Sequence, residues 1–328
     1  MTVVFSGIQP SGETHIGNYL GAIRHWAVDQ HEHTSYYCVV DLHSLTTPHD
    51  PAELRSKSLG MATMLVACGL DPDVCTIFVQ SHVAEHTRLA WLLECTASIG
   101  ELQRMTQFKD KSARTSGEFI SAGLLTYPTL MTADIVLYDT DRVPVGEDQR
   151  QHIELARDVA IRFNSRYGET FVVPQGAIPK TGARVMDLQE PTNKMSKSVD
   201  SPQGTVMVLD PPDVIERKLS RAVTDSDGEV RFDVAAKPGV SNLLSILAAS
   251  TGESVEALAG RYTQYGPLKK DTAAALIEAL RPVRERYESL AADPAAMTEV
   301  LRKGASKARD VASATYERAR TAIGLLES

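Results

Sequence analysis

The chain has 328 residues, of which 43% are hydrophobic and 23% are charged. This length accommodates two domains or one large domain with an appendage, and the composition excludes an intrinsically disordered protein. The formal net charge of −8 argues against a general nucleic-acid coat, although it leaves room for a local basic patch. No apolar run approaches the length of a membrane span, and no basic stretch precedes the short apolar run at residues 3–5. We therefore expect no membrane contact, no signal peptide and a cytoplasmic location.

The four cysteines form no Cys-x-x-Cys pair, which a zinc finger needs beside its pair of histidines. Disulfides are rare in cytosolic proteins, and a free cysteine behaves as a small hydrophobic residue. We therefore expect buried free thiols and no protein-bound metal. The cysteines are Cys38, Cys68, Cys75 and Cys95.

Segments typical of buried strands alternate with segments typical of helices over the first two-thirds of the chain. Pro51 stands at the favoured first position of one helix, and Gly69 follows the end of that helix. This alternation predicts an α/β fold, with a parallel sheet flanked by helices and ligands at the carboxyl ends of the strands. We expect strands at residues 3–8, 36–40, 76–79 and 142–145, and helices at residues 17–30, 50–68, 85–95 and 148–164.

Beyond residue 204 the sequence indicates helices almost throughout, and the last strand-like stretch is residues 206–209. The final helix carries a stripe of mostly small residues at helical spacing, which allows close packing against another element. We predict a first domain over residues 1–206 and an all-α second domain over residues 207–307, after which residues 308–328 return to the first domain. The stripe consists of Leu301, Ala305, Ala308, Ala312, Thr315, Ala319 and Ile323.

The turn after the first strand has the features of a phosphate site. Glycines let the backbone approach a ligand, and a helix begins near His15 and Asn18, which share a helical face. The N-terminus of a helix offers unpaired N–H groups and a partial positive charge. Taken alone, however, the segment could equally be a loop with a helix cap and a surface histidine.

A second polar segment far downstream supports the phosphate site. Residues 194–198 read Lys-Met-Ser-Lys-Ser, and a loop of this kind can close over a triphosphate with Lys194 and Lys197 as point charges. The alternative for this segment alone is an exposed basic loop. Because the two segments occur together, we expect an enzyme that uses ATP.

The paired segments resemble the signatures of the class I aminoacyl-tRNA synthetases. Asn18 stands at the last position of the first signature, where a histidine is common in the class, and it carries no charge at any pH. Within the class, the chain looks like the bacterial tryptophanyl-tRNA synthetases over essentially its whole length. The segments that carry the resemblance are residues 8–12, 15–19, 100–109, 122–128, 145–154, 194–198, 222–226 and 237–244.

The resemblance implies a Rossmann-like catalytic domain over residues 1–206 and a helical domain over residues 207–307 that binds the tRNA anticodon. It also implies a reaction in two steps. The carboxylate of L-tryptophan attacks the α-phosphate of ATP to give tryptophanyl-adenylate and pyrophosphate. The acyl group then passes to the terminal adenosine of tRNA(Trp). Mg²⁺ is expected on the phosphates, and a homodimer is implied.

The resemblance also implies the ATP-binding residues. Residues 146–148 are expected to reach the adenosine, with a carboxylate suited to the ribose hydroxyls. The catalytic residues implied are Gln9, Asn18, Lys111, Lys194 and Lys197, although Lys111 could equally be a surface charge. The full ATP-binding set is Gln9, Pro10, Ser11, Gly17, Asn18, Gly146, Glu147, Asp148, Val185, Lys194, Met195, Ser196, Lys197 and Ser198.

Asp134 is the residue expected to recognise tryptophan. A carboxylate within an otherwise apolar helix is expensive to bury without a partner, and the indole N–H can only donate. Phenylalanine would leave the Asp134 acceptor unmet, so the site should reject it strongly. The surrounding residues are expected to supply an aromatic wall (Phe5), apolar walls (Met131, Val143, Val145) and polar contacts to the α-amino group (Tyr127, Gln149).

Residues 281–320 contain nine Lys or Arg and six Asp or Glu, against the overall negative charge. A solvated helix surface explains this composition, but the resemblance favours a surface that faces tRNA. Two other functions stay open. One is a tyrosyl-tRNA synthetase, although the wall formed by Val143 and Val145 offers no second hydrogen bond to a phenol. The other is a catalytically silent paralogue that binds tryptophan or RNA.

Overall fold

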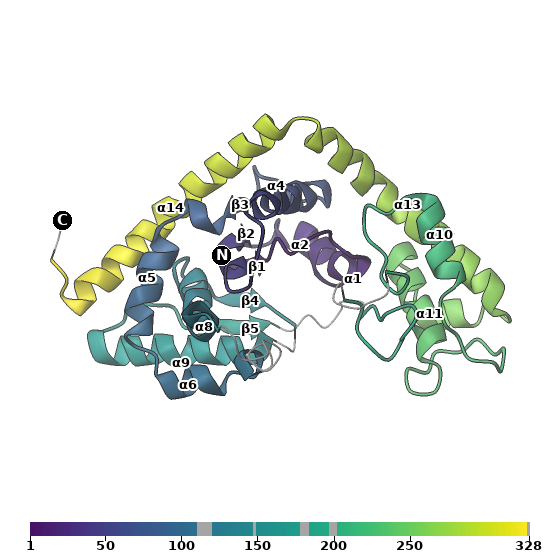
Figure 1. Ribbon diagram of the computed structural model, residues 1–328, viewed down its shortest axis with the longest axis horizontal. Coiled ribbons are helices and arrows are strands. Elements are labelled where there is room, and N and C mark those ends of the chain that lie inside the picture. Colours follow the sequence, from purple (N-terminus) through teal and green to yellow (C-terminus); the bar gives the residue numbers. More distant parts are fainter. Residues whose placement is uncertain (110–119, 147–148, 178–183, 197–201, 327–328) are drawn as a thin grey trace.

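A computed structural model describes residues 1–109, 120–146, 149–177, 184–196 and 202–326. Within these residues the predicted parallel sheet is confirmed, with five strands in the order β3-β2-β1-β4-β5 (Figure 1). The strand order changes direction at β1, which pairs with β2 on one side and β4 on the other. Ligands bind at the carboxyl ends of strands at such a switch point. The strands are β1 (Val3–Ile8), β2 (Thr34–Val39), β3 (Thr76–Val79), β4 (Arg142–Pro144) and β5 (Gln175–Ala177).

Helices cover both faces of the sheet. Successive side chains of a strand point to opposite faces, so Tyr37 and Val39 enter one apolar cluster while Tyr36 and Cys38 enter the other. The first cluster lies under α1 (Ile16–Asn18), η1 (Tyr19–Ile23), α2 (Arg24–Asp29) and α4 (Pro51–Ala67). The second lies under α5 (Glu85–Glu94), α8 (Ala122–Val136) and α9 (Arg150–Tyr167). The short elements α3 (Asp41–Ser44), η2 (Gln80–His82) and α6 (Ile99–Arg104) connect these helices and strands.

The predicted limits of α4 are confirmed to within one or two residues. Asp50 caps the helix by accepting a hydrogen bond from the Glu53 N–H, and Pro51 follows at the first position. After the helix, Gly69 adopts a φ of 109°, which only glycine takes without strain. The helix predicted over residues 17–30 begins one residue earlier and contains a π-turn at Tyr19–Ile23.

The chain after residue 206 is helical, with α10 (Pro212–Ser220), α11 (Pro238–Thr251), α12 (Val255–Ala259), α13 (Tyr265–Ala291) and α14 (Pro294–Ile323). The expected strand at residues 206–209 is wrong. Only Met207 pairs there, as an isolated antiparallel bridge to His15. The stretch stays short because Asp210 closes a turn, accepting the Met207 N–H at 2.9 Å and leading the chain into α10.

Helix α14 lies along the sheet part of the molecule (Figure 1), in contact with α4, α5 and β3. Ala308, Ala312, Thr315 and Ala319 are fully buried, so the predicted close packing of the small-residue stripe is confirmed. The first apolar cluster also continues from the sheet into α11 and α13. The division into domains at residues 206 and 307 stays a prediction, because one core serves both parts.

The cysteines of the chain are free thiols, but only three are buried. Burial raises the pKa of Cys68 and Cys75 to about 12. The expectation of a buried thiol is wrong for Cys95, which stands at the exposed C-terminal end of α5. Over the described part of the chain, no helix combines the length and the apolarity that a membrane span requires.

Candidate active site

A cavity of about 360 Å³ opens at the carboxyl ends of β1 and β4, where the strand order changes direction. The structure brings together around it all the residues that the sequence assigned to tryptophan. Two residues assigned to ATP, Gln9 and Gly146, also line this cavity. The lining that was predicted is Phe5, Tyr127, Met131, Asp134, Val143, Val145 and Gln149.

Asp134 is 1% exposed and has three polar partners. Its Oδ1 accepts a hydrogen bond from Gln80 at 2.7 Å and lies 2.6 Å from His86 Nδ1. Its Oδ2 lies 2.8 Å from His43 Nε2. These partners within the chain offset the cost of burying the carboxylate. The protein itself supplies three donors to this carboxylate, so most of its acceptor capacity is met before an indole binds.

The charge of Asp134 is favoured by its two histidines. Burial alone would raise its pKa, but hydrogen bonds from His43 and His86 hold the pKa well below its ordinary value. His86 is held from behind, since its Nε2 lies 2.8 Å from the Tyr138 hydroxyl. The carboxylate is therefore ionised across the physiological pH range.

Sequence reasoning missed these three partners of Asp134. His43 and Gln80 follow the carboxyl ends of β2 and β3, in α3 and η2. The two ends are tied together, because Leu42 N donates to Gln80 Oε1 at 3.1 Å and Ser81 N donates to Asp41 Oδ1 at 3.0 Å. Polar residues directly after predicted parallel strands were the signal that could have identified His43 and Gln80.

Tyr127 lines the cavity from α8. Its hydroxyl lies 2.6 Å from His152 Nε2 and donates to Gln107 Oε1 at 3.3 Å. Burial raises the pKa of Tyr127 to about 12, so the hydroxyl stays protonated at neutral pH. Phe5 is fixed from the other side, because its ring stacks on Tyr138 with 5.5 Å between centroids. The cavity thus has a rigid aromatic wall and a polar rim.

A second cavity of about 200 Å³ adjoins the first, since Gln9 and His43 line both. Pro10 and Ser11 line the second cavity, so three residues assigned to ATP lie beside the predicted tryptophan site. Among the residues that the structure describes, Lys194 lines neither of these two cavities.

The two signature segments meet through backbone pairing. The second begins in a hairpin, here called the lysine-loop stem (residues 185–195), in which Met186 pairs with Lys194 and Met195 N donates to Val185 O at 3.1 Å. Gly17 of the first segment lies against this stem. A Cβ at residue 17 would lie 3.7 Å from Val185 Cβ and 2.9 Å from the His15 ring. The structure thus places Gly17, Val185, Lys194 and Met195 in one region.

The predicted helix N-terminus is less open than expected. Its first N–H, that of Ile16, already donates to Val206 O at 2.9 Å. Asn18 ends α1, with its N–H donating to His15 O. Ser196 is half-buried, and its carbonyl accepts the Thr205 hydroxyl at 3.0 Å. The predicted residues Lys111, Glu147, Asp148, Lys197 and Ser198 lie outside the described residues.

The basic residues of the C-terminal segment are mostly engaged within the chain. Arg309 donates to His82 O at 2.6 Å, and Arg318 pairs with Asp139 at 2.5 Å. Seven of the nine Lys and Arg residues in 281–320 have such partners, so the segment is less available to a polyanion than its composition indicates. The seven are Arg281, Arg284, Arg302, Lys307, Arg309, Arg318 and Arg320.

Known proteins resemble this chain over almost its full length. Residues 1–281 match the family described as tRNA synthetases class I (W and Y). The chain is 57% identical to tryptophan–tRNA ligase 1 of Streptomyces coelicolor, over 99% of this chain and 98% of that protein. The crystal structure of tryptophanyl-tRNA synthetase from Mycoplasma pneumoniae superposes with a TM-score of 0.92 at 36% identity, over 99% of this chain and 98% of that one. The Campylobacter jejuni enzyme, complexed with ADP and tryptophan, superposes with a TM-score of 0.85 at 34% identity, over 99% and 100% of the two chains.

Proposed function

The chain belongs to the class I tRNA synthetases of the tryptophan and tyrosine group and acts as a tryptophan–tRNA ligase, and from this premise we propose which residues carry its reaction. ATP, tryptophan and tRNA are its substrates. The tyrosyl and silent alternatives are not retained, since relatives that match the full chain at 49% to 57% identity are tryptophan–tRNA ligases.

The cavity around Asp134 is the proposed tryptophan site, and this proposal rests on the residues that line the cavity. Its volume falls in the range of small-molecule sites, which pair apolar walls with a few polar groups. Phe5, Val143 and Val145 would enclose the indole, and the indole N–H would donate to Asp134. Tyr127 and Gln149 would bind the α-amino group.

Rejection of phenylalanine by Asp134 is weaker than a carboxylate with no other partner would give. A carboxylate has about four acceptor positions, and three donors already use Asp134. Losing the indole N–H then costs one charged hydrogen bond, about 1.5–3 kcal/mol, which is roughly a 10- to 150-fold preference. The remaining discrimination must come from the fit of the larger ring system to the apolar walls.

ATP would bind beside this site, along Gln9, Pro10 and Ser11 and toward Gly146. Gly17, Asn18 and Val185 would hold its remaining parts, with residues 147–148 at the ribose. Lys194, Met195 and Ser196, followed by residues 197 and 198, would close on the phosphates, joined by Lys111. Transfer of the adenylyl group asks a protein mainly for positioning and charge stabilisation, which is the work proposed for Lys194 and Lys197.

Mg²⁺ has no dedicated site in this proposal. In the described part of the chain, no group of three His, Cys, Asp or Glu side chains could hold a metal ion. The ion would instead arrive on the phosphates of ATP, and the protein residues would bind the complex around it.

ATP–pyrophosphate exchange with a panel of amino acids tests the proposal. We expect exchange with tryptophan and far weaker exchange with phenylalanine and tyrosine. Replacing Lys194 or Lys197 with alanine should lower kcat much more than the affinity for tryptophan. Unchanged adenylate formation in both variants would remove the assigned role of the lysines.

For tRNA, we propose binding through phosphate contacts that releases counterions, so affinity should fall steeply with salt. An affinity that stays flat from low to high salt would contradict this. A cytoplasmic location accompanies the proposal, because charged tRNA is consumed by translation.

A homodimer is the proposed assembly. A groove of about 380 Å³ beside α5 and α8 is lined by Leu45, Ala90, Trp91 and Leu130, and Trp91 is 65% exposed. Exposed apolar patches of this kind mark association surfaces. The groove also reaches Tyr127, which lines the tryptophan cavity on its other side. A second copy of the chain is the occupant we propose for it.

A further inference from the structure

Asn242 joins helix α11 to the lysine-loop stem by two hydrogen bonds. Its Oδ1 accepts the Met186 N–H at 2.8 Å, and its Nδ2 donates to Met186 O at 2.8 Å. The two residues are 56 positions apart in the sequence, and Asn242 is only 4% exposed. One side-chain amide thus satisfies both backbone groups of one stem residue, as a neighbouring strand would.

Met186 is the residue of the stem that pairs with Lys194. The next pair is held as well, because Asp187 N donates to Asn193 O at 2.9 Å. The position of Lys194 is therefore set by a two-stranded hairpin whose other strand is bonded to Asn242. Such short hairpins are only marginally stable without support from neighbouring elements.

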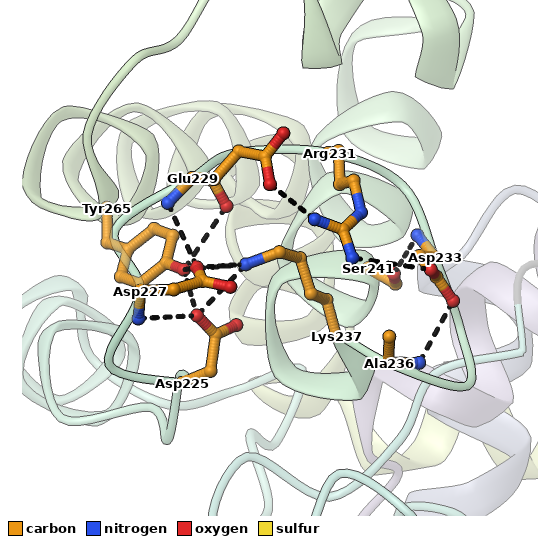
Figure 2. Close-up of polar contacts among 9 residues, drawn as sticks. All are labelled: Asp225, Asp227, Glu229, Arg231, Asp233, Ala236, Lys237, Ser241 and Tyr265. Atoms are coloured by element: carbon orange, nitrogen blue, oxygen red, sulfur yellow. Dashed lines mark hydrogen bonds and ion pairs between the residues drawn. The ribbon is translucent and has the colours of Figure 1, made fainter.

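The start of α11 is itself fixed by the preceding loop, as Figure 2 shows. The ammonium group of Lys237, a residue that is 1% exposed, lies among Asp225, Asp227 and Tyr265. Asp233 N donates to Ser241 Oγ at 2.9 Å, directly before Asn242 in the chain. Asn242 therefore projects from a turn of helix that is anchored on both sides.

A close backbone approach sets the distance between this helix and the chain that follows the stem. A Cβ at Gly239 would lie 2.1 Å from Val223 O, so only glycine fits there. Val223 N in turn donates to Leu188 O of the stem at 2.8 Å. Residues 222–226 and 237–244 resembled the synthetase family without any role in the substrate sites, and they meet at this support for the stem.

We propose that Asn242 is a positioning residue for Lys194, holding the lysine-loop stem in the register that presents the lysine to the phosphates of ATP. The inference rests on the role proposed above for Lys194. Without the amide, the stem loses its two bonds to α11 but keeps its pairing at Leu188, so it would shift rather than unfold. A misplacement of about 1 Å at a catalytic group costs roughly 100-fold in rate.

The test is single-turnover adenylate formation by Asn242→Ala, beside tryptophan affinity measured at equilibrium. We expect the rate at saturating tryptophan to fall about 10- to 100-fold and the KM for ATP to rise, with tryptophan affinity within about twofold of the wild type. Asn242→Ser keeps a polar side chain but cannot span both Met186 groups, so it should show the same pattern. It replaces the alanine variant as the test if that variant folds poorly. Normal rates in both variants would overturn the inference.

Asn164 provides a matched control. From α9 its side chain makes a similar clamp, donating to Phe171 O at 2.8 Å and accepting from Phe171 N at 3.0 Å, away from the proposed site. Asn164→Ala should cost comparable stability and leave the KM for ATP unchanged. If Asn164→Ala raises this KM as much as Asn242→Ala does, the effect is general destabilisation and the inference is wrong.

A double-mutant cycle separates this inference from the proposed site. If Asn242 acts through Lys194, the double variant should be little slower than Lys194→Ala alone. A slow Lys194→Ala enzyme with fully additive losses in the double variant overturns only the role of Asn242. A Lys194→Ala enzyme with normal adenylate formation overturns the lysine site as well.

Discussion

The two carboxylate oxygens of Asp134 have different roles, since one is held by the protein and the other faces the proposed ligand cavity. Oδ1 is held by Gln80 and His86, neither of which lines the cavity, whereas Oδ2 faces His43, which does. A neutral His86 that donates from Nδ1 to Asp134 can accept a hydrogen bond from the Tyr138 hydroxyl at Nε2. The supporting side therefore fixes the carboxylate, and the remaining acceptor capacity faces the cavity.

Replacing Asp134 with asparagine should impair tryptophan use more than ATP use. The amide keeps the shape but loses the charge, and its NH₂ group cannot accept from both histidines. We expect the KM for tryptophan to rise about 10-fold or more and the preference over phenylalanine to narrow, with the KM for ATP nearly unchanged. Amino-acid-dependent pyrophosphate exchange measures all three quantities.

Thr132→Val is the control for Asp134→Asn on the same helix. The Thr132 hydroxyl is fully buried and donates to Pro128 O at 2.8 Å, but it does not line the cavity. Loss of this hydroxyl should lower stability slightly and leave the KM for tryptophan unchanged. If Asp134→Asn behaves like Thr132→Val in the exchange assay, Asp134 is a structural carboxylate and the indole has another partner.

At the scale of elements, helix α14 and strand β3 approach one another through a glycine. A Cβ at Gly304 would lie 1.8 Å from the Ile77 carbonyl oxygen, so the helix rests directly on the strand backbone. The small residues that follow along the same face extend this contact. The stripe thus has a structural role, which explains why it contains so few large side chains.

Gly304→Ala should destabilise the protein although alanine is the better helix former. Helix propensity favours alanine by about 1 kcal/mol. Separating the helix from the strand backbone costs about 3 kcal/mol, because a carbonyl group cannot move aside as a flexible side chain can. The net loss of about 2 kcal/mol should appear as a lower midpoint in urea unfolding.

Gly60→Ala is the matched substitution for Gly304→Ala. Gly60 lies within α4, and a Cβ there would have one contact, at 3.4 Å from the Tyr287 hydroxyl. Helix propensity should therefore determine the effect on stability. The variant should be as stable as the wild type or up to about 1 kcal/mol more stable. Equal effects of the two substitutions would contradict the close contact between α14 and β3.

Glu101 ties α6 to α9 and should give stability that depends on pH. It forms a capping box with Ser98 and pairs with Arg162, which also donates to Thr96 O at 3.0 Å. The hydrogen bond from Arg162 lowers the pKa of Glu101 from 4.5 to about 2. Because the folded-state pKa is the lower one, the stabilisation is complete above about pH 4.5 and is lost as pH falls toward 2.

Glu101→Gln should accordingly cost about 1–2 kcal/mol at pH 7. The difference from the wild type should shrink when urea unfolding is repeated at pH 3.5. A cost that stays constant between the two pH values would mean that shape, rather than the charge of Glu101, holds the two helices together.

The sequence was sufficient to predict the elements but not every contact between them. Strand β3 was predicted at its observed limits, because its β-branched and aromatic residues lie between clear helix ends. Residues 206–209 have the same local character but form only one bridge, since Asp210 ends the pairing. Likewise Asp134 stood out as a polar residue in an apolar helix, whereas His43 and His86 come from separate segments that only the fold brings together.

At the scale of the whole molecule, many charged side chains hold the chain together. The net charge of −8 disfavours polyanions at long range. The basic residues of α14 largely form contacts within the chain. Lys307 donates to Pro72 O and Arg309 donates to His82 O, at the two ends of β3. Binding of tRNA must therefore use a local surface whose attraction exceeds this background.

The proposed dimer should depend on Trp91. A glutamate at this position would place a charge in the apolar groove between α5 and α8, and tryptophan is a common source of binding energy at interfaces. We expect Trp91→Glu to weaken self-association about 30-fold or more, measured by sedimentation over a range of protein concentrations. Val74 is an exposed valine at the opposite, amino end of β3, so Val74→Glu should leave association unchanged. A Trp91→Glu protein that remains dimeric would mean that the interface lies on another face of the molecule.

The same substitution should also affect tryptophan binding. Because Tyr127 lines both the groove and the tryptophan cavity, the Trp91→Glu monomer should show a raised KM for tryptophan.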